Sequence, residues 1–195
     1  MKCKKIFILF FIIIIIAVVL FFIFRNNGTK NLKIGNNTSS QEIVDYILNI
    51  NSYEVVIEVD VKSNKNENKY KIKQVYNGND NNSQEVLEPS NISGVKIIKE
   101  GNNLKIENSD LNLTNILQNY EYISENVLDL SSFIDNYKNN SNSKWEEKDD
   151  KIIMKTSNRS LYINRENGLP EKMEIKDNGK KAAIYILYNE VNVNS

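Results

Sequence analysis

The sequence predicts an α+β protein: a single antiparallel β-sheet with helices covering one face, preceded by one N-terminal transmembrane helix. Three observations predict this fold class. Residues 6–24 are all apolar. Most later segments alternate apolar and polar residues with the period of two that marks a half-buried strand. The expected elements then follow in the order helix, strands, two helices, strands, which is typical of a sheet with its helices on one side.

The apolar run has the length of a membrane-spanning helix. Its 19 residues extend over roughly 28 Å, close to the hydrocarbon thickness of a bilayer. Three lysines precede the run and a single arginine follows it, so the positive-inside rule places the N-terminus in the cytoplasm. We therefore expect a signal anchor at residues 1–25, a polar tether at 26–37 and an extracytoplasmic domain at 38–195. A cleaved signal peptide is the alternative, but no small-x-small cleavage site follows the run.

Charge is distributed unevenly along the chain. The whole sequence is neutral, yet residues 1–37 hold six basic residues and no acidic one, which leaves 19 basic against 25 acidic residues in the outer domain. A domain with a net charge of −6 is not suited to binding nucleic acid through its phosphates. It is also mildly repelled by anionic lipid surfaces.

The first half of the outer domain begins with a helix. Ser39 and Glu42 have the spacing of a capping box, and an apolar stripe at i, i+3 and i+4 follows them. The period then changes to two over 53–62, which predicts a long strand with one buried face. Further strands are expected at 69–76, 85–88, 95–98 and 104–106, the last two joined by a Gly-Asn-Asn turn.

The second half is predicted to contain two helices and a final group of strands. Apolar spacing of three and four indicates helices at 113–122 and 127–137, with Asp129 near the start of the second. The strands expected after them are 145–147, 152–156, 160–164, 171–177 and 182–193. Asp-Asp, Asn-Gly and Gly-Leu-Pro sequences mark the turns between these strands.

The sequence lacks the groups that most enzyme mechanisms use. It has no histidine, and its one cysteine, Cys3, precedes the apolar run, which excludes Ser–His and Cys–His nucleophiles and histidine metal sites from the outer domain. The adjacent carboxylates at 146–147 and 149–150 alternate with lysines, as in a solvated hairpin. Serine–lysine catalysis is open by composition, but no Ser-x-x-Lys motif begins a helix. We predict a protein that is not an enzyme, with no catalytic residue, cofactor or metal site.

Aromatic residues are the best candidates for a binding surface. The chain has ten tyrosines and one tryptophan, and several lie on expected strands. Tyrosine suits a half-wet cavity or a protein interface because its ring is apolar and its hydroxyl can face water. Cross-strand packing within the sheet is the alternative explanation. The candidates for contact with a partner or a lipid are Tyr53, Tyr70, Tyr76, Trp145, Tyr162 and Tyr185.

Two stretches carry a resemblance to a known family. The segment 160–180, SLYINRENGLPEKMEIKDNGK, has a strand ending in a Gly-Leu-Pro turn, a Lys-Met-Glu-Ile strand and an Asn-Gly turn before a last strand. With the first helix and its Tyr-Glu-Val-Val-Ile-Glu-Val strand, it resembles LolA-like lipoprotein carriers over 38–62 and 144–193. Among these the chain is most similar to the clostridial spore germination lipoproteins of the GerS group. The resemblance implies a half-barrel sheet with helices over its concave face.

The same resemblance implies a role. The GerS group is non-catalytic and works with a CwlD-type N-acetylmuramoyl-L-alanine amidase that modifies the spore cortex for germination. It implies an extracytoplasmic location in the forespore or spore envelope. The group carries a lipobox cysteine, which this chain lacks after its apolar run. A transmembrane helix at residues 6–24 would replace the lipid physically, because either keeps the domain at the membrane.

Two function hypotheses therefore remain. The first is a membrane-anchored adaptor that binds and activates a cortex or cell-wall amidase. The second is a carrier or binding protein for lipid or lipoprotein acyl chains, which the anchor disfavours because a carrier must diffuse between membranes. A sensor role is weaker still, since five residues before the apolar run leave little with which to signal.

Overall fold

The computed structural model describes residues 38–62, 67–78, 81–101, 103–118, 127–177 and 181–193. The expected anchor at 6–24 and tether at 26–37 lie outside these residues, as does the end of the helix predicted at 113–122. Within the described part, none of the helices is both long enough and apolar enough to cross a membrane.

All strands belong to one open antiparallel sheet, which confirms the predicted α+β class with a single sheet. The strand order is β6-β5-β4-β3-β2-β1-β11-β10-β9-β8-β7, and the sheet does not close on itself. The sheet thus has β6 and β7 as its two edges in the part of the chain that is described. The strands are β1 (Tyr53–Lys62), β2 (Glu67–Tyr76), β3 (Asn81–Glu88), β4 (Val95–Glu100), β5 (Asn103–Asn108), β6 (Leu113–Leu117), β7 (Lys144–Lys148), β8 (Lys151–Lys155), β9 (Arg159–Asn164), β10 (Pro170–Asp177) and β11 (Lys181–Val193).

Helix α2 (Ser40–Leu48) begins at the predicted capping box. The Glu42 amide donates to the Ser39 hydroxyl at 3.3 Å, and the Ser39 amide donates to the Glu42 carboxylate at 2.7 Å. These two bonds satisfy amides that the first turn cannot pair within the helix. The stripe of Ile43, Val44 and Ile47 is buried against the sheet, as the spacing predicts.

Helix α3 (Leu130–Asn139) confirms the second predicted helix with a later start, but the first predicted helix is wrong over the residues described. Residues 113–117 form β6, which pairs with β5 from Asn108↔Leu113 to Leu104↔Leu117. A turn precedes this strand, in which the Asn112 amide donates to the Ser109 carbonyl and Asn112 has φ 51°. The neighbouring strand supplies backbone partners that an isolated helical turn would have to find within itself.

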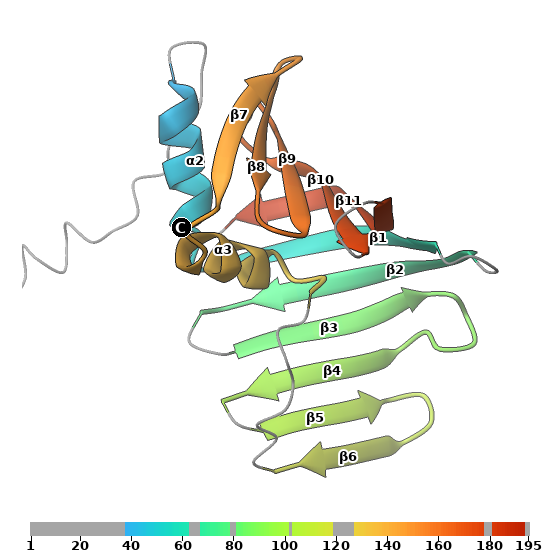
Figure 1. The fold of residues 1–195 in the computed structure, drawn as a ribbon. Coiled ribbons are helices and arrows are strands. Elements are labelled where there is room, and N and C mark those ends of the chain that lie inside the picture. The colour runs from blue at the N-terminus through green and yellow to red at the C-terminus, as the bar shows by residue number, and fades with distance from the viewer. Residues whose placement is uncertain are drawn as a thin grey trace, which may run out of the picture. The chain divides into compact units, whose positions relative to one another are not determined.

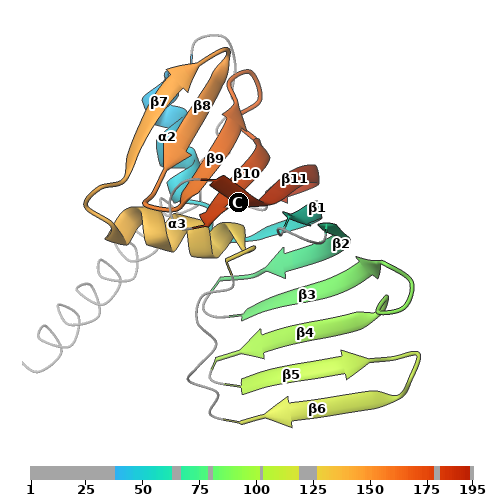
Figure 2. The same ribbon diagram turned by 45° about the vertical axis from the view of Figure 1, so that its right-hand side comes forward.

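The sheet bends, and the two helices lie in the bend. In Figures 1 and 2, β7–β10 stand at an angle to β2–β6, and α3 runs from the vicinity of β2 towards the start of β7. We call the helix-covered side the inner face and the opposite side the outer face. Side chains wholly buried on the inner face, each with no exposed surface, are Ile57, Ile152, Met154, Leu161, Ile163, Met173 and Ile186.

The C-terminal strands form the expected meander. The Gly168 amide donates to the Asn164 carbonyl at 2.9 Å, and Gly168 has φ 65°, a conformation that a side chain disfavours. Pro170 then starts β10 opposite Ile163 of β9. The Gly-Leu-Pro turn thus sets the register that carries Leu161 and Met173 together into the core.

Candidate functional site

The six aromatic candidates do not form one site, because the sheet separates them. Tyr53, Tyr70 and Tyr76 lie on the inner face of β1 and β2 and contact the core, and Trp145 lies opposite the buried Met154. The other two candidates lie on the outer face. Because side chains alternate along a strand, most of these residues cannot meet around one ligand, although Tyr70 lines the same hollow as Tyr185. The outer-face residues are Tyr162 and Tyr185.

Tyr53 is part of the structure rather than of a binding surface. Only 2% of its surface is exposed, and its ring lies 5.4 Å from that of Tyr76, centroid to centroid. Its hydroxyl accepts the Ser131 amide proton at 3.2 Å and lies 3.5 Å from the Ser131 hydroxyl. Burial raises the pKa of Tyr53 well above its usual range, with a further rise from the charge of Asp129. Tyr53 therefore joins β1 to the first turn of α3.

Asp129, which precedes α3, is the most perturbed carboxyl group among the described residues. It is 4% exposed, and its side chain does not cap the helix. Instead it accepts a short hydrogen bond from the Gln84 amide and another at 3.4 Å from Asn82, both on β3. Burial raises the pKa of Asp129 from 3.8 to about 6, against the opposite effects of the Gln84 bond and of Lys99. This group holds the start of α3 over β3.

Arg159 is a second buried polar group under α3. Its guanidinium donates to the Ser132 hydroxyl at 3.0 Å and to the Ser132 carbonyl at 3.3 Å, and it lies 5.9 Å from the Phe133 ring centroid. Tyr188 of β11 is buried close to these groups, and its pKa is raised by burial. These contacts fasten α3 to β9, so the space between the helices and the sheet is occupied by the chain's own side chains.

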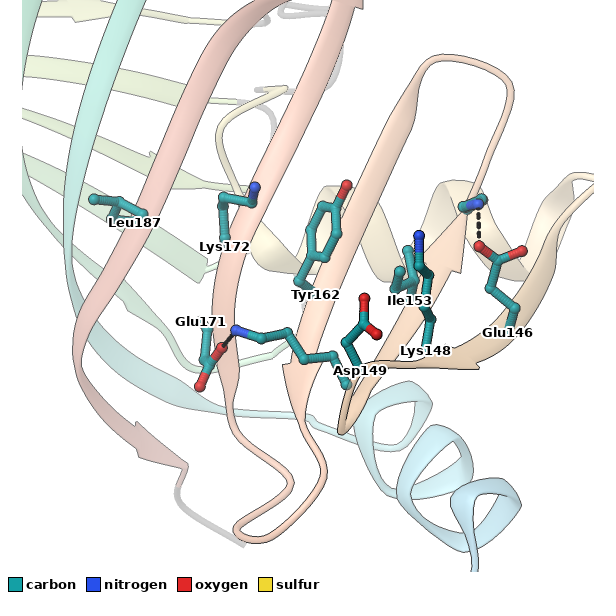
Figure 3. Close-up of a pocket in the computed structure, with 10 residues that line it drawn as sticks. Glu146, Lys148, Asp149, Ile153, Tyr162, Glu171, Lys172 and Leu187 are labelled. Atoms are coloured by element: carbon teal, nitrogen blue, oxygen red, sulfur yellow. Dashed lines mark hydrogen bonds and ion pairs between the residues drawn. The ribbon is translucent and has the colours of Figure 1, made fainter.

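The outer face carries a long shallow groove, part of which Figure 3 shows. Two hollows of about 560 and 410 Å³ share Lys172 and Leu187 and so form one groove. Strand pairing places one residue from each of eight strands in a single row along it. In order, the row is Glu146, Ile153, Tyr162, Lys172, Leu187, Glu58, Lys71 and Glu88.

Charges in the outer groove are largely paired with each other. Lys172 donates to Glu174 at 2.7 Å and lies 4.4 Å above the Tyr162 ring, while the Tyr162 hydroxyl donates to Glu174 at 3.1 Å. Lys151 and Glu171 form a short ion pair, visible in Figure 3, which lowers the pKa of Glu171. The pKa of Tyr162 is raised, mainly by burial and secondly by the negative charge of Glu174. Such mutual pairing gives a hydrophilic surface and activates no nucleophile.

Sequence reasoning missed the apolar surface of β4–β6. Inner-face residues there are mostly aliphatic, and a groove of about 330 Å³ runs between β4, β5 and the turn before β6. Leu111 is 64% exposed, Leu113 59%, Ile116 56% and Ile97 39%. The inner-face aliphatic residues of this region are Val95, Ile97, Leu104, Ile106, Leu113 and Leu117.

The signal for this surface lay in the turn. Asn108-Ser109-Asp110 is rich in turn-forming residues, and it directly precedes the apolar segment at 113–117. Read as a hairpin, this pattern predicts a strand whose alternate side chains continue the apolar face of 104 and 106. Read as a helix, the same leucines form a buried stripe and the exposed surface disappears.

The acidic side chains of the described residues are dispersed rather than clustered. No group of three or more carboxylates or thiols among them is arranged to hold a metal ion. The carboxyl groups with perturbed pKa belong to the capping box of α2 (Glu42), form ion pairs with lysine, as Glu146 does with Lys155 at 2.6 Å, or lie buried beneath a helix. The geometry instead offers surfaces for binding.

An open, bent antiparallel sheet with helices packed in its bend is a LolA-like fold, and comparison with solved structures agrees. The structure of the CwlD amidase from Clostridioides difficile in complex with the GerS lipoprotein contains a chain that matches with a TM-score of 0.50 and 24% identity, over 82% of this chain and 98% of that chain. An uncharacterised conserved protein from Thermus thermophilus matches with a TM-score of 0.50 and 12% identity, over 80% and 88% of the two chains. The fold is LolA-like and close to that of GerS.

The sequence itself places the chain in a family. A family model described as sporulation protein YdcC-like matches residues 4–195, so the chain belongs to the YdcC-like sporulation proteins. A LolA superfamily protein, NE2245 from Nitrosomonas europaea, is also similar, with a TM-score of 0.41 and 15% identity over 81% of this chain and 94% of that one. No curated protein matches the sequence.

Proposed function

We propose that this protein is a non-catalytic adaptor that binds a cortex or cell-wall amidase of the CwlD type and activates it during sporulation. Membership of the YdcC-like sporulation family supports the process. The similarity to a structure in which the GerS lipoprotein is bound to the CwlD amidase supports the kind of partner. The absence of histidine from the whole sequence supports a role without catalysis.

The observation that carries the proposal is the contrast between the two parts of the inner face. Under α2 and α3 the inner face is filled, with Phe133 and Ile43 wholly buried against β-sheet side chains. On β4–β6 the same face is largely aliphatic, and it is exposed at Leu113 and Ile97 although Leu104 is buried. Exposed aliphatic surface beside a polar rim is typical of a protein–protein interaction site.

The proposal includes a membrane location. The apolar run at 6–24 and the lysines before it favour a retained signal anchor with residues 38–195 on the extracytoplasmic side. An anchor at the same membrane raises the effective concentration of adaptor and amidase for each other. This arrangement makes a modest interface sufficient for function.

A complex formed in co-expression tests the proposal. The full chain and a CwlD-type amidase, co-expressed and extracted in mild detergent, are expected to elute together from gel filtration. The mixture is expected to hydrolyse peptidoglycan faster than the amidase alone, and the adaptor alone is expected to hydrolyse none. Separate elution together with an unchanged amidase rate would refute the adaptor function.

The second candidate is a carrier for acyl chains, and the aliphatic groove of about 330 Å³ on β4–β6 favours it. Native mass spectrometry of the purified protein distinguishes the two. A carrier is expected to retain fatty acid or lipoprotein acyl groups through purification, whereas the adaptor is expected to have its unliganded mass. Bound acyl chains without amidase binding would put the carrier in place of the adaptor.

A further inference from the structure

We propose that the free edge of β6 takes up an extended, uncharged segment of a protein partner as an additional strand of the sheet. This inference rests on the proposed function in that it names the surface through which the adaptor would bind. It starts from the difference between the two edges of the sheet, β6 and β7.

Edge β7 is protected against the addition of a strand. Four of the five residues in Lys144–Lys148 are charged. Glu147 is also tied to the rest of the domain, since it accepts a short hydrogen bond from Ser40 at the start of α2 and lies 3.6 Å from Arg165. Charged side chains on an edge strand and coverage by a helix are the means by which proteins prevent edge-to-edge pairing.

Among the described residues, edge β6 has neither of these protections. Its five residues, LTNIL, include no charge and no proline. The strand pairs with β5 on one side only within the described part of the chain, so alternate backbone N–H and C=O groups point away from the sheet. A row of this kind is a template for another strand, and β-strand addition is an established mode of peptide recognition.

The side chains define what the added segment must look like. Leu113 and Leu117 point to the inner face and Ile116 to the outer face, and Leu113 and Ile116 are 59% and 56% exposed. The two charged residues of the adjacent strand β5, Lys105 and Glu107, form a short ion pair with each other. An incoming strand with aliphatic side chains on both of its faces, beside Leu113 and Leu117 on the inner face and beside Ile116 on the outer face, would therefore bury apolar surface without leaving a charge unpaired.

The groove on the inner face indicates that the occupant is a folded protein rather than a lipid or a second copy of this chain. A lipid cannot satisfy the backbone groups of the edge. A second copy paired edge to edge would extend the sheet and leave the groove beside Val95, Leu111 and Leu113 uncovered. A five-residue strand alone is also too small for a stable interface, which needs roughly 1,000 Å². A partner whose body rests on this groove while one segment pairs with β6 meets both requirements.

Photo-crosslinking in sporulating cells tests the inference with the full chain. A benzophenone side chain is introduced at position 115, in the middle of β6, and at position 187 as the matched control. Leu187 is 47% exposed on the outer face of the central strand β11, so it samples the same domain away from the edge. Position 115 is expected to give an adduct with an uncharged segment of another protein, mapped by mass spectrometry, and position 187 is not.

A second test adds positive charge to the β6 edge. The double variant Leu113→Lys/Ile116→Lys is expected to reduce the adduct at position 115 at least tenfold, whereas Leu187→Lys leaves it unchanged. Both variants replace exposed side chains, and their melting temperatures verify that the fold is kept. No adduct at position 115, an adduct with this same chain, or an adduct insensitive to the two lysines would overturn the inference.

The identity of the adduct separates the two proposals. If the mapped segment belongs to a CwlD-type amidase, both stand. If it belongs to a different protein, the edge is a binding site and the amidase assignment fails. If the amidase co-elutes with the chain while position 115 gives no adduct and the β6 amides exchange hydrogen as fast as in the free protein, the adaptor function stands and the edge inference fails.

Discussion

At the scale of single residues, the buried polar groups under α3 decide how the helix sits on the sheet. Asp129, Tyr53 and Arg159 come from three distant parts of the chain, and their bonds tie the start of α3 to β3, β1 and β9. Buried polar groups that keep their partners add specificity to an otherwise aliphatic core. Two of them lead to measurable predictions.

Asp129 makes stability depend on pH in an unusual direction. Its folded-state pKa of about 6 lies above the ordinary 3.8, so the folded protein binds this proton more tightly than the unfolded chain does. Its contribution to stability is therefore present at low pH and is lost as the pH rises through about 6. A difference of this size corresponds to roughly 3 kcal/mol.

Asp129→Asn is expected to abolish this dependence. Urea unfolding of both proteins at pH 4.5 and pH 7 isolates the contribution of Asp129 to the free energy of unfolding. The other carboxyl groups, such as Glu171 with its lowered pKa, are the same in both proteins, so their effects cancel in the comparison. Relative to the native protein, the variant is expected to gain about 2 kcal/mol of stability between pH 4.5 and pH 7, because at pH 4.5 the unfolded chain is already mostly ionised. Parallel stability profiles for the two proteins would show that Asp129 titrates normally.

Tyr53→Phe removes one hydroxyl from the core. The Ser131 amide then loses its acceptor at 3.2 Å while remaining buried. The expected loss of stability is about 1–3 kcal/mol, measured by urea unfolding. Tyr185→Phe is the control, because Tyr185 lies on the outer face and a change there is expected to stay within about 0.5 kcal/mol. Equal effects of the two substitutions would contradict the structural role of Tyr53.

At the scale of elements, local signals at chain boundaries were the most reliable guide. The capping box at Ser39 and Glu42 and the turn at Gly168 both lie where the sequence places them, because each depends on contacts within four residues. The segment 113–117 was mistaken because its pattern fits two periods and only pairing with β5 resolves them.

Ser39→Ala tests the weight of the capping box. The Glu42 amide at 3.3 Å loses its acceptor, and the start of α2 is expected to lose about 1 kcal/mol of stability. Thermal or urea unfolding measures the loss. Ser141→Ala, in an exposed turn, is the matched control and is expected to have no effect. A loss no larger than that of the control would mean that packing of Ile43 and Ile47 alone fixes the helix.

At the scale of the whole molecule, the domain is expected to fold without its N-terminal segment. All described elements begin at or after Ser40, and the core contains only side chains from beyond that point. Residues 38–195 alone are expected to be soluble, with a circular dichroism spectrum dominated by β-structure and unchanged by EDTA. A helix-dominated spectrum or unfolding by the chelator would contradict this.

The intact protein is expected to keep its first 25 residues. No small-x-small cleavage site follows Phe24, so membrane-extracted protein is expected to retain residues 1–25. Mass spectrometry of the protein extracted from membranes measures this directly. A mature N-terminus close to Asn26 would instead identify a cleaved signal peptide.

The sequence by itself determined the single antiparallel sheet, the capped first helix, the C-terminal meander and the LolA-like resemblance, since alternation and turn chemistry are local properties. It also excluded histidine chemistry, because composition needs no structure. Only the tertiary structure decided which aromatic residues lie on which face, and it divided the six candidates into four inner and two outer. It also placed β6 at an edge of the sheet within the described part of the chain. Strand order and helix coverage are set by contacts between residues far apart in the chain, which a local pattern does not contain.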